Sequence, residues 1–220
     1  MNRRRVVPSA DVAASRQRPN RAALAGRAAL DRLLAARNEH PERLAAIDQE
    51  IHRRFGQTRA VMVLDMCGFS RLTMRHGITH FLAMIHRLHA IVRPIVTARG
   101  GDVVKTEADN VFAVFADVSP ATAAAREIMD RLRAANVFLP EDWDLHVSMG
   151  IGYGQILMIG EHDLFGSEVN VASKLGEDIA GRGETLLTQA AHARLPAGAR
   201  TEKLPIQIGT LTLTAFKLLA

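Results

Sequence analysis

Apolar residues along the chain follow two different periods, and the two periods predict helices and strands. Between residues 78 and 98, apolar side chains recur every three or four positions, which predicts one long helix. An alanine-rich segment over 120–135 shows the same spacing. Short runs of apolar and β-branched residues at 60–66 and 146–155 instead predict strands, the second interrupted by Gly150, Gly152 and Gly154. Glycines inside a strand often mark the close approach of another backbone or of a ligand.

The remaining elements complete a mixed pattern. Residues 102–116 read as two strands joined by a tight turn at Ala108-Asp109-Asn110. Further periodicity predicts a helix over 167–179, a short return strand or loop over 157–165, and weaker strands at 184–188, 201–208 and 211–218. The order β-α-α-β-β-α-β predicts an α+β fold of ferredoxin-like type.

The segment before residue 58 is predicted to be an extension of the main domain, 58–220. Within 21–57, a helix over 21–37 precedes Pro41, and a second helix carries the apolar stripe Leu44, Ile47, Ile51 and Phe55. These helices either pack on the main domain or serve in dimerisation or signal relay. Residues 1–20 read as a flexible basic arm, with a targeting segment as the alternative.

Charge and cysteine content narrow the function classes. Residues 1–59 hold 13 of the 28 basic residues but only 6 of the 23 acidic ones, so the basicity belongs to the extension. Aromatic residues for base stacking are absent from 1–54, which argues against a nucleic-acid partner. Cys67 is the single cysteine and favours a reducing, cytoplasmic location. No apolar run approaches a membrane span, so we expect no transmembrane segment.

Two aspartates in strand-like surroundings suggest a cation site. Asp65 lies inside the apolar run 61–66, where it could alternatively cap the helix that follows. Asp109 lies at the hairpin tip, where it could alternatively be an ordinary turn residue. Two carboxylates brought together from neighbouring strands favour a site for two divalent cations.

Polar groups near these acids suit a phosphorylated ligand. Gly68, Phe69 and Ser70 form the turn after Asp65, with Ser70 the expected helix cap, and their backbone N–H groups would face a triphosphate. Lys105, one of only four lysines, shares a strand face with Asp109; it is either solvated or a donor to a base edge. Asn170 and Lys174 are spaced i, i+4 on one helix face, which is either an exposed polar face or a phosphate-stabilising pair.

Four segments together carry a resemblance to a known family. They are LDMCGFS, GGDVVKTEADNVFAVF, SMGIGYGQ and DLFGSEVNVASKL, in the family's order. From about residue 58 onward, the chain resembles the class III adenylate and guanylate cyclase catalytic domain. The resemblance covers about three quarters of the sequence.

The resemblance implies roles for individual residues. Asp65 and Asp109 match the two metal-binding aspartates, with the backbone carbonyl of Met66 as a further ligand for two cations, Mg²⁺ or Mn²⁺. Lys105 and Asp163 match the pair that reads adenine, which implies ATP as substrate. Asn170 matches the ribose-orienting asparagine, and Lys174 stands at the position of the transition-state arginine. The family builds its site at a dimer interface, which implies a homodimer.

Three departures from the family pattern open a second hypothesis. Lys174 replaces an arginine, and lysine lacks the planar guanidinium fork. Ala108-Asp109-Asn110 replaces a Gly-Asp-Gly-like turn. Gln207-Ile208-Gly209 lacks the usual phosphate-binding lysine. The sequence therefore predicts an adenylate cyclase that makes 3′,5′-cyclic AMP and pyrophosphate, with a weak or inactive nucleotide-binding regulator as the alternative.

Overall fold

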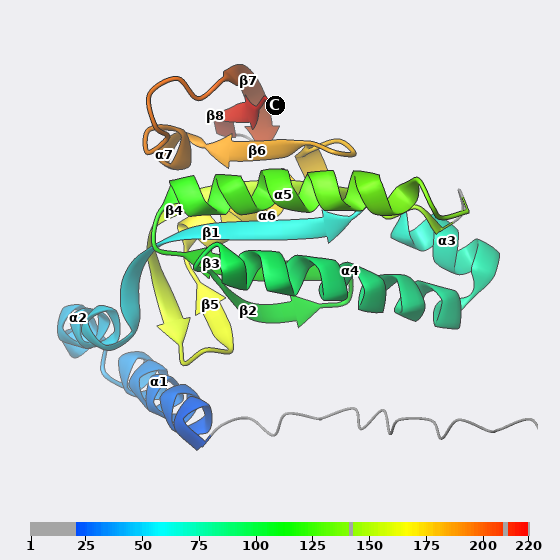
Figure 1. Cartoon of the computed structure of the whole chain (residues 1–220). Helices are drawn as coiled ribbons and strands as arrows, with labels where there is room; N and C mark the ends of the chain where they lie inside the picture. The colour runs from blue at the N-terminus through cyan, green and yellow to red at the C-terminus, as the bar shows by residue number, and fades with distance from the viewer. Residues whose placement is uncertain (1–20, 141–142, 209–210, 220) are drawn as a thin grey trace, which may run out of the picture.

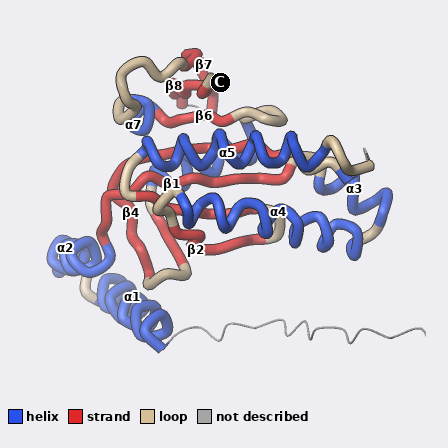
Figure 2. The backbone as a smooth tube through the Cα atoms, in the orientation of Figure 1, coloured by secondary structure: helices blue, strands red, loops and turns tan. Residues whose placement is uncertain are grey.

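The computed structural model describes residues 21–140, 143–208 and 211–219, so the predicted arm 1–20 lies outside the described residues. Figures 1 and 2 show one mixed sheet with helices on its faces. The helices are α1 (Arg21–Glu39), α2 (Leu44–Phe55), α3 (Phe69–His76), α4 (Ile78–Ala98), α5 (Val118–Asn136), α6 (Ser167–Lys174) and α7 (Gln189–His192), with a 3₁₀ turn at Pro41–Arg43. The strands are β1 (Gly56–Met66), β2 (Asp102–Glu107), β3 (Asn110–Phe115), β4 (Val147–Ile159), β5 (Asp163–Phe165), β6 (Thr185–Thr188), β7 (Thr201–Ile208) and β8 (Leu211–Leu218).

The sheet confirms the predicted α+β architecture. Its order is β2-β3-β1-β4-β6-β8-β7, with β5 paired to the end of β4. β1 is central and antiparallel to both β3 and β4, while β4 and β6 run parallel. The predicted strands and helices from 60 to 136 all form, because each has an unbroken apolar period and a glycine or turn at its ends.

Alternation along β1 gives the two faces of the sheet different partners. Ala60, Met62, Leu64 and Met66 belong to the main core, which α4 and α5 cover. Val61 and Val63 face the other side, in a smaller cluster with Phe112, Val169 and Ala172. Figure 1 shows α4 and α5 in front of the sheet and α6 behind it. Because side chains alternate along a strand, Asp65 lies on the same face of the sheet as Val61 and Val63. This is the face of the smaller cluster, which α4 and α5 do not cover.

Helix α4 is long and apolar enough by length and composition to cross a membrane, the one such helix among the described residues. Six of its residues are nonetheless buried in the core: Phe81, Met84, Leu88, Val92, Ile95 and Val96. A core helix of a folded domain meets the same criteria, and this packing is what the fold requires of α4. The length and composition of α4 are therefore only weak evidence for a membrane span.

The glycines of β4 admit α6 against the sheet. A Cβ added to Gly150 would lie 1.9 Å from the carbonyl oxygen of Ala172, and one on Gly152 would lie 2.8 Å from that of Glu168. The close approach predicted from these glycines is thus the approach of another backbone. The predicted helix 167–179 ends as α-helix at Lys174 and finishes in a π-helical turn, Leu175–Ile179. This wider turn brings Gly176 against the backbone of Gly150 and Val63.

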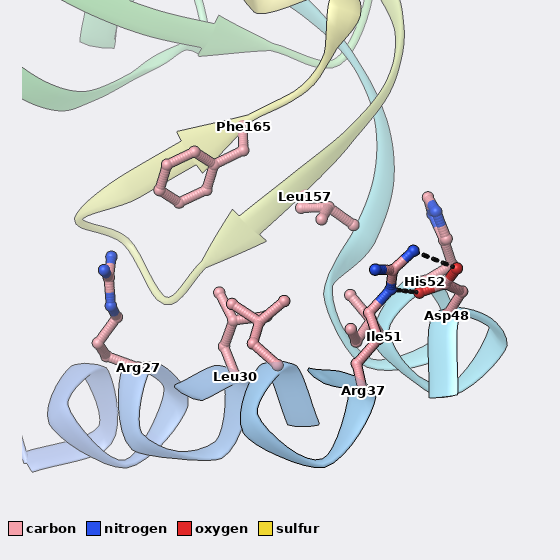
Figure 3. A pocket seen from close by; sticks show the side chains of 9 residues that line it. Arg27, Leu30, Arg37, Asp48, Ile51, His52, Leu157 and Phe165 are labelled. Carbon is pink, nitrogen blue, oxygen red and sulfur yellow. Dashed lines mark hydrogen bonds and ion pairs between the residues drawn. The ribbon is translucent and has the colours of Figure 1, made fainter. Parts of the chain in front are cut away.

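The N-terminal extension folds into two helices at one end of the sheet. Leu30, Ile47, Ile51 and Phe55 bury together against Ile159 of β4. Arg37 of α1 also forms a bidentate ion pair with Asp48 of α2, with N–O distances of 2.5 and 3.2 Å (Figure 3). The apolar stripe predicted for the second helix therefore packs on the main domain through Ile47, Ile51 and Phe55, whereas its first residue, Leu44, is 36% exposed.

Candidate functional site

The two predicted metal-binding aspartates lie at the same end of neighbouring strands. β1 pairs with β3 as far as Leu64 opposite Val111, so Asp65 lies one residue and Asp109 two residues beyond the last pair. Asp109 is 8% exposed, which is low for a carboxylate in a hairpin turn. Burial, followed by the negative charge of Asp109 and of Glu177, raises the pKa of Asp65 to about 7. Burial likewise raises the pKa of Asp109.

This electrostatic arrangement fits a divalent cation. Within the described residues, no group of three histidine, cysteine or carboxylate side chains converges as a ready metal site. The available donors are instead two carboxylates and the backbone carbonyl of Met66, all of them hard oxygen ligands. The half-buried carboxylate of Asp65 and the buried one of Asp109 repel each other and would be stabilised by a cation placed between them. The Asn110 side-chain oxygen beside Asp109 is also buried without a hydrogen-bond partner.

The hairpin tip holds a strained residue. Ala108 has a φ of 51°, the single non-glycine residue in the described structure with a positive φ. Asparagine 110, which tolerates such a conformation better, is instead the first residue of β3. Alanine therefore adopts the left-handed conformation in the place where a glycine would adopt it without cost.

The turn after Asp65 differs from prediction in one respect. Ser70 was expected to cap the next helix, but α3 begins at Phe69 and its cap position is Gly68, without a side-chain hydrogen bond. The reason is that Gly68 adopts a φ of 88°, so the chain turns from β1 into α3 two residues earlier than expected. The N–H groups of Phe69 and Ser70 still belong to the first turn of this helix.

The structure brings Lys105 and Asp163 together. Nζ of Lys105 lies 3.1 Å from Oδ1 of Asp163, and 2.7 Å from Oε1 of Glu107. Its ammonium also lies 4.8 Å from the ring centroid of Phe112. Burial lowers the pKa of Lys105, but the hydrogen bonds that its ammonium donates to Glu107 and Asp163 outweigh burial and raise the pKa above its ordinary value. Lys105 is thus a charged, oriented donor.

Asn170 and Lys174 project from α6, and no ion pair joins Lys174 to Asp65 or Asp109 of its own chain. Asn170 is exposed, and Nζ of Lys174 lies 2.5 Å from Oδ2 of Asp178 in the following turn. Glu168, which sequence reasoning missed, fixes the helix that carries them. Its Oε2 accepts hydrogen bonds from the Tyr153 N–H at 3.0 Å and the Thr188 hydroxyl at 2.9 Å.

Two further groups near the site escaped sequence reasoning. Glu177 and Asp178 add negative charge near Asp65, and their place in the π-helical turn could not be read from the helical period. Arg27 of α1 donates to Oδ2 of Asp163 at 3.3 Å. Arg27 is one of many arginines in an Ala/Leu/Arg-rich segment, so no local signal marked it.

Comparisons with known proteins identify the family of the chain. Residues 53–208 match the family described as adenylate and guanylate cyclase catalytic domain. The chain is 31% identical over 144 residues to "Putative adenylate cyclase 3" of Rhizobium meliloti (strain 1021), covering 66% of this chain and 24% of that protein. It is 32% identical over 117 residues to "Adenylate cyclase" of Streptomyces coelicolor, covering 53% and 29%. The chain thus spans between a quarter and a third of the length of these curated relatives.

Solved structures show the same fold. The adenylate/guanylate cyclase/hydrolase from Silicibacter pomeroyi superimposes with a TM-score of 0.63 at 24% identity, covering 75% of this chain and 98% of that one. A bacterial light-regulated adenylyl cyclase gives a TM-score of 0.66 at 21% identity, covering 74% and 52%. With the family match extending over more than two thirds of its length, the chain belongs to the adenylate and guanylate cyclase catalytic domain family.

Proposed function

We propose that this protein is an adenylate cyclase that converts ATP to 3′,5′-cyclic AMP and pyrophosphate. The observation that carries the choice of ATP is the ion pair between Lys105 and Asp163, 3.1 Å apart. Adenine presents a ring-nitrogen acceptor beside an amino donor, and a lysine beside a carboxylate is complementary to that pattern. Guanine presents a carbonyl and a ring N–H at the same positions, so the same pair would oppose it.

The acids at the hairpin would hold the metals of the reaction. Asp65, Asp109 and the Met66 carbonyl supply oxygen donors for two divalent cations, Mg²⁺ or Mn²⁺. When bound, these cations would lower the pKa of the ribose 3′-hydroxyl and neutralise phosphate charge. The N–H groups of the Gly68–Ser70 turn would donate hydrogen bonds to the triphosphate oxygens. The 3′-oxygen would then attack the α-phosphorus as the bond to pyrophosphate breaks.

A homodimer would complete this site. Asn170 and Lys174 lie on the exposed side of α6, spaced i, i+4, so another protomer can contact both. In a two-fold dimer, Asn170 of one protomer would orient the ribose bound to the metals of its partner. Lys174 would stabilise the charge that develops on the α-phosphate. Each protomer carries every group, so the dimer would contain two equivalent sites.

A specific contact favours a second candidate function, a nucleotide-binding regulator with little or no turnover. Lys174 replaces the family's arginine, and its charge is paired with Asp178 at 2.5 Å. Gln207 also carries no charge where the family has a phosphate-binding lysine. A protein of this kind would gain thermal stability from ATP without consuming it.

Incubating the purified chain with Mn²⁺ or Mg²⁺ and each of ATP, GTP, CTP and UTP separates the two functions. An adenylate cyclase yields cyclic AMP and pyrophosphate from ATP, and the Asp65→Asn variant serves as the inactive control. ATP-dependent stabilisation without any cyclic product would instead identify the regulator. Formation of cyclic GMP in preference to cyclic AMP would overturn the assignment of the base-reading pair.

A further inference from the structure

The Asp163 carboxylate receives donors from three parts of the chain. Its Oδ1 accepts from Nζ of Lys105 at 3.1 Å and from the Leu164 N–H at 3.0 Å. Its Oδ2 accepts from Nη1 of Arg27 at 3.3 Å. Lys105 and Leu164 lie inside the segment that matches the family, whereas Arg27 lies on α1, outside it. A residue of the N-terminal extension therefore contacts the aspartate predicted to read the base.

Helix α1 is held against the hairpin that carries Asp163. Leu30, one turn after Arg27, is 5% exposed and packs with Ile51 and Ile159. Gly26 lies beside the same hairpin, where a Cβ added to it would be in ordinary van der Waals contact with the Gly160 backbone nitrogen, at 3.8 Å. Figure 3 shows Arg27 reaching from α1 toward the β4–β5 hairpin. Arg27 is one of the residues that line a cavity of about 460 Å³ between these elements. Its guanidinium lies 6.0 Å from the ring centroid of Phe165, which gives it a second contact on that hairpin.

The charges around Lys105 give Arg27 a specific task. Lys105 serves two carboxylates, Glu107 at 2.7 Å and Asp163 at 3.1 Å. Without a second cation, this group of three side chains would carry a net negative charge, and Asp163 would compete with Glu107 for one ammonium. Arg27, whose Nε also lies 3.3 Å from Oδ1 of Asp31, supplies the second cation through Nη1 and orients the oxygen of Asp163 that Lys105 leaves uncontacted.

The contact of Arg27 leaves room for a base. A lysine ammonium has three donors, of which Glu107 and Asp163 use two, so one donor remains for a ring nitrogen. A carboxylate oxygen has two lone pairs, of which Arg27 uses one on Oδ2, so one remains for an amino group. Arg27 therefore constrains the acceptor without occupying it.

We propose that Arg27 is a positioning residue for base selection, which orients the Asp163 carboxylate so that Oδ2 accepts the amino group of adenine. The proposal rests on the proposed function, because it assigns part of the ATP preference to the extension. The pair is partly exposed, with 54% of the Arg27 side chain accessible and 26% of that of Asp163. An exposed pair of this kind contributes modestly, so we expect effects of about two- to fivefold.

The experiment compares the full chain with Arg27→Gln, Arg27→Lys and the matched control Arg32→Gln, which changes an exposed arginine on the same helix. Arg27→Gln should raise KM for ATP about two- to fivefold with kcat unchanged, because uniform binding is lost. The KM for GTP should stay constant, so the ATP-to-GTP ratio of kcat/KM falls by the same factor. Arg27→Lys should recover part of the ratio, and Arg32→Gln should leave it unchanged.

Calorimetric binding of ATP and GTP with Mn²⁺ separates failure of this proposal from failure of the proposed function. If the wild type binds nucleotide without turnover and the Arg27→Gln variant shows a lower preference for ATP over GTP, the proposal of cyclase activity is wrong and the proposed role of Arg27 stands. If the wild type turns over and Arg27→Gln matches Arg32→Gln, the role of Arg27 is overturned. A lower KM for ATP in Arg27→Gln would also overturn it, since Arg27 would then block the base. Absence of nucleotide binding in the wild type would overturn both.

Discussion

Nζ of Lys105 lies 3.1 Å from Oδ1 of Asp163, although the two residues come from β2 and β5, which are far apart in the chain. The contact forms because β5 folds back along the end of β4 through the pairs Leu157–Phe165 and Ile159–Asp163. Both side chains are mostly shielded, with 22% and 26% of their surface accessible. An ion pair in such a position discriminates between bases better than a fully solvated one, because water screens it less.

Replacing Lys105 by glutamine should weaken ATP binding. The variant loses a charge-assisted hydrogen bond, which is worth about 1.5–3 kcal/mol, so KM for ATP should rise about 10- to 100-fold. Lys203→Gln is the matched control, because Lys203 is an exposed lysine on another strand. Steady-state kinetics with ATP and GTP measure the effect. Equal KM values for the two variants would mean that Lys105 does not contact the base.

The raised pKa of Asp65 predicts how stability depends on pH without metal. The pKa of this group is about 7 in the folded protein and near 3.8 when it is unfolded, so the folded state binds more protons between these values. Stability contributed by Asp65 therefore falls as pH rises from about 4 to about 7, and stays low above that. Asp65→Asn should melt higher than wild type at pH 8 in EDTA, and the difference should vanish near pH 4.

Divalent cations should reverse the order of the two melting temperatures at pH 8, so that the wild type melts higher than Asp65→Asn. Metal binds the deprotonated carboxylate, so Mn²⁺ should raise the Tm of the wild type at pH 8 but leave that of Asp65→Asn nearly unchanged. Thermal denaturation with and without Mn²⁺ measures both effects. A wild-type Tm that is indifferent to Mn²⁺ at pH 8 would contradict the assignment of Asp65 as a metal ligand.

Prediction from sequence succeeded where a single local period decides the structure. The strand at Asp65, helix α4 and the hairpin at Asp109 each have an unbroken apolar pattern and clear ends, and the family match agrees with the fold they build. Patterns of this kind encode which face of an element is buried. The end of the helix after Lys174 was missed because the π-helical turn is set by packing of Gly176 on Gly150, a tertiary contact.

Contacts between distant segments account for the remaining differences. The Arg27–Asp163 contact joins the first described helix to a strand 136 residues later in the chain, and neither residue's neighbours indicate the other. Glu168 was likewise not singled out from the sequence, although its carboxylate joins β4 and β6. Such contacts depend on how the elements pack, which apolar periodicity does not specify.

The glycines of β4 give a prediction about the stability of the fold. A Cβ at position 150 would lie 1.9 Å from a backbone oxygen, so Gly150→Ala must displace α6. We expect it to lower the free energy of unfolding by at least about 2 kcal/mol, as overpacking does in a close-packed core. At position 154 the nearest atom is Cγ of the Glu168 side chain at 2.8 Å, which can move, so Gly154→Ala should cost less. Urea denaturation compares the two variants, and equal losses would contradict this packing.

The pairing of Lys174 with Asp178 predicts how the rate can be increased. The two side chains are 43% and 54% accessible, so the ion pair is weak and Lys174 can leave it for a phosphate. Asp178→Asn removes the competing carboxylate and should raise kcat about two- to fivefold, the range that an exposed pair allows. Lys174→Arg should also raise kcat, because a guanidinium can contact two phosphate oxygens at once.

Both variants should be assayed at saturating Mn²⁺, since Asp178 also raises the pKa of Asp65 and thereby affects metal binding. Asp130→Asn, which removes an exposed acid on α5 that pairs with Arg133, is the matched control. If Asp178→Asn and Lys174→Arg both leave kcat unchanged while Asp65→Asn abolishes turnover, Lys174 does not act in the transition state.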